Sequence, residues 1–168
     1  GYYLTKNYRE AYNLFACSGI LFNHESPRRS VNFVSRKITH NLSLILSNKK
    51  KKIELGNINS KRDWGHAKDY VYAMWKMLQL KKPQDFVIGT GKLHSVKDFL
   101  NIAFNYVNLD YKKYIKINKK FYRPYDKFYL LADTKKAKKT LKWRPKISFK
   151  SLVIDMVKKD LLTIKKND

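Results

Sequence analysis

Residues 19–29 read GILFNHESPRR, an apolar run that passes directly into a polar and charged segment. The apolar residues 20–22 are typical of a short buried strand, and the segment 23–29 after them is expected to form a loop. Open α/β sheets bind ligands just beyond the carboxyl ends of their strands, so this stretch predicts an α/β fold with a ligand site in the loop. The alternative interpretation is a solvated surface loop in which Pro27 fixes a turn.

The rest of the chain alternates between helix-like and strand-like patterns. Apolar periodicity and composition predict helices over residues 2–16, 32–47, 68–79, 133–143 and 150–164. A further helix is expected after Ser95, which forms a capping pattern with Asp98 three residues later. Strands are predicted at residues 53–55 and 85–89 and, at an edge, 114–122, whereas residues 62–66 are expected to be extended or to form a turn.

The size and composition of the chain indicate one globular domain. It has 168 residues, of which 43% are apolar, and no linker divides it. No apolar run approaches the roughly 20 residues that cross a bilayer. The single cysteine, Cys17, excludes an internal disulfide and is expected to be a small core residue in a reducing, cytoplasmic setting. The start of the chain carries no signal peptide. Because it begins with Gly1 rather than Met, we expect it to be a piece of a longer protein.

The chain is strongly basic, with a formal net charge of +24. Such an excess favours phosphate-bearing partners and is found in proteins that bind nucleic acid. The lysines, however, are spread over separate runs at 48–52, 112–120 and 135–139. We therefore interpret them as solvated faces and loops, and a dedicated nucleic-acid surface is the less favoured alternative.

Two other stretches place arginine beside residues that suit a phosphate group. They are RDWGHAKDY at 62–70 and YRPYD at 122–126. The planar fork of arginine suits bidentate binding of phosphate. The structural alternative for the first stretch is that Asp69 caps the following helix and His66 packs against its neighbours. No Gly-rich dinucleotide or nucleotide fingerprint occurs, and no histidine has metal-ligand spacing, so no metal site is predicted.

Several of these segments together resemble one known family. NYREAYNLFACSGILFNHESPRR, FVSRKI, LGNINSKRDWGHAKDYVYAMW and the stretch from DFVIGTGKLHSVKDF to YRP are similar to the GDP-mannose 4,6-dehydratases, which are extended short-chain dehydrogenases/reductases. The resemblance covers nearly the whole chain and weakens after residue 145. It implies the C-terminal part of an extended Rossmann-type α/β enzyme, with the Gly-rich cofactor-binding half absent. Residues 1–30 would end the Rossmann-type core, and residues 31–168 would mostly bind the nucleotide sugar.

The resemblance also implies an activity. The family uses NADP to oxidise GDP-mannose at C4, eliminates water across C5–C6 and returns the hydride to C6, which gives GDP-4-keto-6-deoxymannose on the route to GDP-fucose. A C4 ketone acidifies the C5 proton, which makes the elimination feasible. A related nucleotide-sugar epimerase or dehydratase is the alternative with the same fold.

Site residues follow from the resemblance position by position. NADP contacts are implied at His24 and Arg29, and substrate contacts at Asn23 for the sugar, Val34 and Lys37 for guanine, Arg62 and Arg123 for the diphosphate, and Asp126 for the ribose. The loop Ser26–Arg29 resembles one that reaches a neighbouring subunit, which implies a homo-oligomer, a dimer or tetramer. The family pattern Arg-Pro-x-Glu-Val-Asp reads RPYDKF here, and the usual insertion before it is shortened, so the ribose contact departs from the family.

The first helix contains a Tyr-x-x-x-Lys spacing, Tyr2 and Lys6, that puts a phenol and an ammonium on one helical face. An ammonium lowers the pKa of a nearby phenol, and the pair is then suited to proton transfer. Ungapped matching of NYREAYNLFA to the family instead places Tyr2 and Lys6 on later turns of the catalytic helix. We therefore expect no catalytic residue within the chain and a catalytic pair that would precede Gly1.

Overall fold

The strands pair two by two within residues 1–122 and 129–166, the part of the chain that this computed structural model describes. The parallel pairs are β1 (Gly19–Leu21) with β6 (Phe86–Ile88), β2 (Asn23–Glu25) with β5 (Trp64–His66), and β3 (Ile53–Leu55) with β8 (Ile115–Ile117). The antiparallel pair is β4 (Lys61–Arg62) with β7 (His94–Ser95). Parallel strands joined through helices confirm the predicted α/β class.

The predicted helices are present, several with shorter bounds. They are α1 (Tyr2–Tyr12), α2 (Val34–Leu46), α3 (Ala67–Leu78), α4 (Val96–Asn105), α5 (Lys135–Thr140) and α6 (Phe149–Lys166), with 3-10 turns η1 (Tyr111–Lys113) and η2 (Lys119–Phe121). The capping pattern before α4 is confirmed, because Ser95 Oγ accepts from the Asp98 N–H at 3.0 Å and the Asp98 carboxylate accepts from the Ser95 N–H at 2.8 Å.

Three local predictions were wrong, and so was the alternative in which Asp69 caps a helix. Helix α1 ends at Tyr12 rather than at residue 16, because Asn13 takes the left-handed conformation with φ 51°. Residues 23–25, expected in a loop, form strand β2, and the edge strand is limited to β8. Helix α3 is capped by His66 Nδ1, which accepts from the Lys68 N–H at 3.1 Å, whereas Asp69 binds elsewhere.

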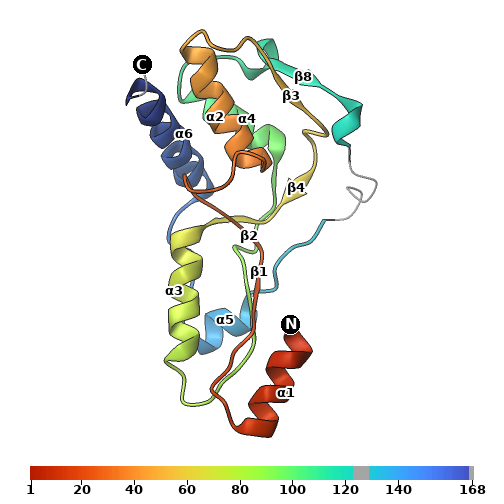
Figure 1. Cartoon of the computed structure of the whole chain (residues 1–168), viewed down its shortest axis with the longest axis vertical. Coiled ribbons are helices and arrows are strands. Elements are labelled where there is room, and N and C mark those ends of the chain that lie inside the picture. Colours follow the sequence, from red (N-terminus) through yellow and green to blue (C-terminus); the bar gives the residue numbers. More distant parts are fainter. Residues whose placement is uncertain (123–128, 167–168) are drawn as a thin grey trace.

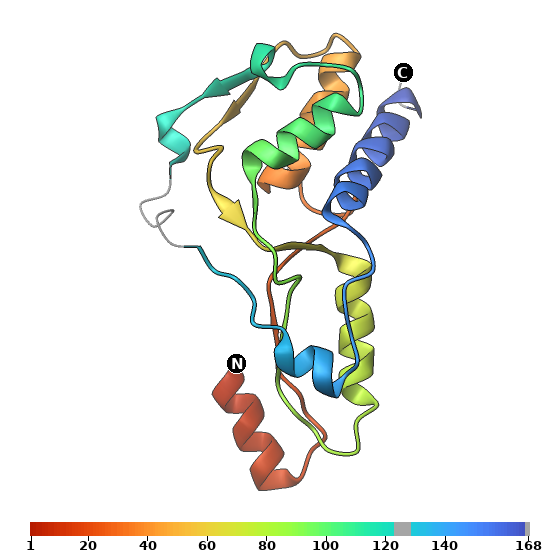
Figure 2. The same cartoon turned by 180° about the vertical axis from the view of Figure 1, so that it is seen from behind.

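Two hydrophobic clusters hold these elements. The larger lies between α2, α4, α6 and β3, and includes Ile38, Phe104 and Met156. The smaller lies between α3, β6 and α5, and includes Met77 and Trp143. Figures 1 and 2 show α2, α4 and α6 gathered at one end with the β3–β8 ribbon, and α3 and α5 at the other.

Helix α1 projects beyond the second cluster and has no buried residue (Figure 1). Its main tie is Arg9, whose guanidinium donates two hydrogen bonds of 2.9 Å to Asp85 and one of 3.0 Å to the Ala16 carbonyl. Cys17, just beyond, is half-buried against the smaller cluster, in agreement with the prediction that it packs. Among the described residues, no helix has the length and apolar character that spanning a membrane requires.

Candidate functional site

One hollow of about 450 Å³ brings together four of the residues predicted to bind substrate. Asn23, Val34, Lys37 and Arg62 all line it, although they come from β2, α2 and β4. The other two predicted residues, Arg123 and Asp126, lie outside the described part of the chain. Four side chains spread over forty positions of sequence thus share one concave surface, which is typical of a small-molecule site.

Strand pairing places the polar side chains of this hollow. In the parallel β2–β5 pair, Asn23 lies opposite Trp64, and both line the hollow. Arg62 is two residues before Trp64, and its backbone pairs with His94 on β7. The Arg62 guanidinium donates to the Lys61 carbonyl at 2.7 Å. The amide of Asn23 on β2 and the cation of Arg62 on β4 therefore line the same hollow.

Helix α2 forms the second wall with its first turn. Val34 and Lys37 are three positions apart, so both lie on the same helical face. The Lys37 ammonium is 4.3 Å from the centre of the Phe121 ring, a cation–π contact. Burial lowers the pKa of Lys37, and the nearby Lys50 lowers it further, while Glu54 raises it. The lysine is thus a partly desolvated cation beside an aromatic ring.

The third wall comes from the ribbon that follows β8. A Cβ on Gly56 would lie 2.6 Å from the Phe121 carbonyl oxygen, so only glycine lets the backbone at Phe121 approach β3 this closely. Asn118 secures the same wall, since its N–H donates to the Leu55 carbonyl at 2.8 Å and its side-chain amide donates to Glu54 at 2.9 Å. The lining residues Lys120 to Tyr122 are fixed in this way.

Glu25 is a lining residue that the sequence reasoning missed. It is only 2% exposed, accepts a 2.6 Å hydrogen bond from the Ser35 hydroxyl and lies 3.3 Å from Arg29 Nε. Burial raises the pKa of Glu25, and the hydrogen bond from Ser35 and the charge of Arg29 oppose that rise. The signal was available, because Asn23 and Glu25 alternate and share one face once residues 23–25 are read as a strand.

The two residues predicted to contact NADP do not line the hollow. His24 lies between Asn23 and Glu25 on β2 and therefore faces the opposite side of the strand. Its Nδ1 donates to the Phe22 carbonyl at 2.9 Å, and its ring stacks on Tyr70 with 5.0 Å between centres. The Arg29 guanidinium lies 3.5 Å above the Phe33 ring, at the rim of the hollow.

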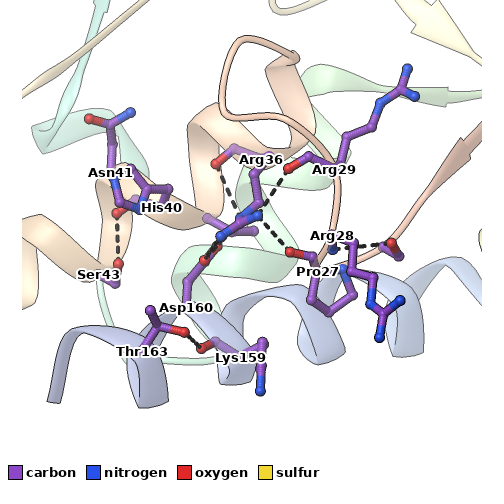
Figure 3. Close-up of polar contacts among 12 residues, drawn as sticks. Pro27, Arg28, Arg29, Arg36, His40, Asn41, Ser43, Lys159, Asp160 and Thr163 are labelled. Carbon is purple, nitrogen blue, oxygen red and sulfur yellow. Dashed lines mark hydrogen bonds and ion pairs between the residues drawn. The ribbon is translucent and has the colours of Figure 1, made fainter. Parts of the chain in front are cut away.

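The loop after β2 is held from beneath by Arg36. One nitrogen of its guanidinium donates to the Pro27 carbonyl at 2.5 Å and to the Arg29 carbonyl at 2.9 Å (Figure 3). Figure 3 also shows the side chains of Arg28 and Arg29 extending in opposite directions. Two adjacent arginines could in principle clamp an anion together, but these two side chains point apart.

Asp63 organises the backbone next to Arg62. This buried carboxylate accepts from the Thr90 N–H at 2.8 Å, the Thr90 hydroxyl at 2.5 Å, the Gly91 N–H at 2.8 Å and the Ala132 N–H at 3.3 Å. Asp69 plays a similar part, since it accepts from the N–H groups of residues 146 and 147. The acidic residues of the 62–70 stretch thus fix the scaffold, and its arginine lines the hollow.

Other candidate positions lie away from this site. A second hollow of about 530 Å³ shares Trp64 with the first but contains none of the predicted site residues. Tyr2 is exposed on α1, and the Lys6 ammonium lies 3.9 Å from the Glu10 carboxylate on the same helix. Figure 1 shows α1 at the opposite end of the molecule from α2 and β3. In residues 1–122 and 129–166, no cluster of three metal-ligating side chains is found.

Solved structures define the class of fold. A structure of RMD from Pseudomonas aeruginosa complexed with NADPH matches with a TM-score of 0.84 at 13% identity, over 95% of this chain and 52% of that one. UDP-glucose 4-epimerase from Thermotoga maritima, with UDP-glucose, matches with a TM-score of 0.80 at 22% identity, over 97% of this chain and 51% of that one. The fold is that of the Rossmann-type nucleotide-sugar epimerases and dehydratases.

Sequence similarity then specifies the family. A family profile described as GDP-mannose 4,6 dehydratase matches residues 1–156, so the chain belongs to that family. GDP-mannose 4,6 dehydratase 1 of Arabidopsis thaliana is 52% identical over 160 residues, which are 95% of this chain and 44% of the relative. The Dictyostelium discoideum and Homo sapiens relatives are 48% and 44% identical over 99% of this chain and 52% and 49% of their own lengths. The chain therefore spans about half the length of the curated relatives it matches.

Proposed function

We propose that this chain supplies the nucleotide-sugar site of an NADP-dependent GDP-mannose 4,6-dehydratase. The observation that carries the proposal is the shared hollow of Asn23, Val34, Lys37 and Arg62, in a chain that belongs to this family. In the proposed enzyme, GDP-mannose is converted to GDP-4-keto-6-deoxymannose. The enzyme would act in the cytoplasm as a homo-oligomer whose contacts include the loop Ser26–Arg29.

The chemistry of the hollow suits the parts of this substrate. Arg62 offers a guanidinium to the diphosphate, which binds such forks through paired hydrogen bonds. Val34 and Lys37 present an apolar edge and a cation on one face of α2, in reach of a planar base. Asn23 offers both a donor and an acceptor to sugar hydroxyls. Each role is assigned on these grounds together with the family resemblance.

The cofactor would lie on the other face of strand β2. His24 fits such a contact, because its Nδ1 donates to the Phe22 carbonyl and its Nε2 makes no hydrogen bond to residues 1–122 or 129–166. Arg29 would reach the cofactor from the loop that follows β2 rather than from that face, because it is paired with Glu25 and stacked on Phe33 at the rim of the hollow. The chemistry supplied by bound NADP in this reaction is removal of a hydride from C4 of the sugar and its return to C6. This chain would hold the sugar and diphosphate still while that transfer takes place.

Calorimetry with the 168-residue chain tests the site. GDP-mannose should bind, and Arg62→Ala and Lys37→Ala should each weaken binding by about tenfold to a hundredfold, because a charge-assisted contact contributes roughly 1.5–3 kcal/mol. Lys6→Ala, on exposed helix α1, is the matched control and should leave the affinity unchanged. Equal loss of affinity in Lys6→Ala would contradict the assignment. We expect no turnover of GDP-mannose with NADP by this chain, since Tyr2 and Lys6 are assigned no catalytic part.

Two rivals make different predictions in the same experiment. A related epimerase or dehydratase would bind UDP-glucose better than GDP-mannose, which would move the proposal to another base and sugar. A nucleic-acid-binding module would bind arbitrary duplex with a steep salt dependence that survives Arg62→Ala. We favour the nucleotide sugar because the site residues converge on one hollow, whereas the lysine runs are dispersed.

A further inference from the structure

Tyr70 is a buried tyrosine that packs against His24, the β2 residue that faces away from the hollow. Tyr70, on α3, has no exposed surface, and its ring stacks on the His24 ring at 5.0 Å with 28° between the planes. From the other side, Trp143 meets Tyr70 edge-on at 6.2 Å. The Trp143 indole is itself fixed, because its Nε1 donates to the Asp69 carbonyl at 2.9 Å. His24 thus rests on a rigid aromatic support.

Gly65 is what lets Tyr70 reach His24. In the β2–β5 register, Gly65 is the direct partner of His24. A Cβ at Gly65 would lie 2.4 Å from Tyr70 Cε2 and 2.9 Å from its hydroxyl, distances that no real side chain tolerates. Any other residue at position 65 would therefore push the Tyr70 ring away from the strand pair.

The hydroxyl of Tyr70 does not account for a tyrosine at this position. It is buried and has no hydrogen-bond partner among the residues that the structure describes, an arrangement that costs roughly 1–3 kcal/mol. Burial and the carboxylates of Asp63, Asp69 and Glu25 raise the pKa of Tyr70, so its phenol stays neutral. The ring, rather than the hydroxyl, makes the contact with His24.

We propose that Tyr70 is a positioning residue that fixes the His24 imidazole with Nε2 presented as a hydrogen-bond acceptor, and that Gly65 provides the space for it. Because the Phe22 carbonyl can only accept, Nδ1 carries the proton and Nε2 of the neutral ring is the acceptor. The ligand group that it would take is an N–H or O–H donor. This inference rests on the proposed function for the identity of that ligand, NADP, but not for the geometry of the imidazole.

Proton NMR of the four histidines tests the geometry in the 168-residue chain. The His24 ring protons, assigned with His24→Gln, should be shifted upfield by the Tyr70 ring. Tyr70→Phe should keep that shift, whereas Tyr70→Leu and Gly65→Ala should abolish it. Tyr72→Leu is the matched control, since Tyr72 is an exposed tyrosine on the same helix that stacks on Trp75. An unchanged His24 shift in folded Tyr70→Leu or Gly65→Ala would overturn the proposal.

Titration with NADPH tests the ligand, with GDP as the reference for the sugar pocket. NADPH should move the His24 resonance, and Gly65→Ala should weaken its binding by roughly threefold to tenfold, the value of one misplaced hydrogen bond. GDP affinity should stay within about twofold, and Tyr70→Phe should match the unaltered chain. If NADPH leaves His24 unmoved in the unaltered chain, the cofactor assignment fails, while the ring-current result still decides the role of Tyr70. Equal loss of GDP and NADPH affinity would reduce Tyr70 to a general packing role.

Discussion

The guanidinium of Arg36 on α2 and the carboxylate of Asp160 on α6 form an ion pair across the interface of the two helices. Arg36 Nε donates at 2.9 Å to both carboxylate oxygens, and a terminal nitrogen approaches one of them at 2.6 Å. Asp160 is only 1% exposed and also accepts from the Thr39 hydroxyl at 2.6 Å. The same guanidinium holds the loop at residues 26–29, so one arginine joins the larger core to the rim of the site.

Breaking this pair should destabilise the whole chain. Asp160→Asn leaves the Arg36 charge largely buried without its counter-ion, and removal of one partner from a buried pair costs about 3 kcal/mol or more. Urea denaturation should show the midpoint falling while the slope stays constant. Lys6→Ala, which removes an exposed ion pair on α1, should change stability by less than ~0.5 kcal/mol. Similar losses in the two variants would contradict the assignment of Arg36–Asp160 as a core contact.

Helix α1 should release from the body at acid pH. The hydrogen bonds from Arg9 lower the pKa of Asp85 from 3.8 to about 2, opposed by burial and assisted by the Ser18 N–H. A pKa lowered by folding means that the contribution to stability is present above about pH 4 and is lost as the pH falls towards 2. Hydrogen exchange should show α1 amides protected at pH 6 and unprotected at pH 2.5. In Arg9→Gln the protection should be weak at both values.

The pH dependence of stability that comes from Glu25 should be opposite in sign to that from Asp85. Its pKa is raised from 4.5 by burial, so the folded chain holds this proton more tightly than the unfolded chain does. Stability that depends on Glu25 therefore falls as the pH rises above 4.5. The free energy of unfolding of Glu25→Gln, relative to that of the unaltered chain, should become larger between pH 4 and pH 7, which means that the variant gains relative stability. A relative stability that moves the other way would show that Arg29 and Ser35 outweigh burial.

The sequence predicted local features well where one segment carries the signal. The Ser95–Asp98 capping box is recognised from a three-residue spacing, and the helices are recognised from the periodicity of their apolar residues. The polar residues 23–25 read as a loop because their strand is defined by pairing with Trp64–His66, some forty positions away. Glu25 was missed for the same reason, because its alternation with Asn23 becomes informative only once residues 23–25 are recognised as a strand. The Arg36–Asp160 pair spans 124 positions and leaves no local pattern.

The site residues also divide into those that the sequence identifies and those that depend on contacts between distant segments. Asn23, Val34, Lys37 and Arg62 were identified by family resemblance, and the hollow brings them together, but their roles in binding stay predictions. His24 was grouped with the cofactor, and strand alternation gives a physical reason, because it faces away from the residues on either side. The support that Tyr70 gives to His24 and the space at Gly65 depend on the pairing of β2 with β5, which lies some forty positions further along the chain.

The last prediction concerns the wall of the hollow at Gly56, where one added methyl group should weaken ligand binding while the chain still folds. In Gly56→Ala the new Cβ would meet the backbone carbonyl of Phe121 at 2.6 Å, and since backbone cannot rotate away as a flexible side chain can, the 120–122 wall must shift. Overpacking of this kind costs typically about 1–3 kcal/mol.

Gly19→Ala is the matched control, since the nearest contact of its new Cβ would be the Leu21 side chain at 3.3 Å, which can move aside. We expect calorimetry to show GDP-mannose affinity reduced by about tenfold in Gly56→Ala and unchanged in Gly19→Ala, because Phe121 also carries the cation–π contact with Lys37. Retained affinity in a folded Gly56→Ala chain would show that this wall takes no part in binding.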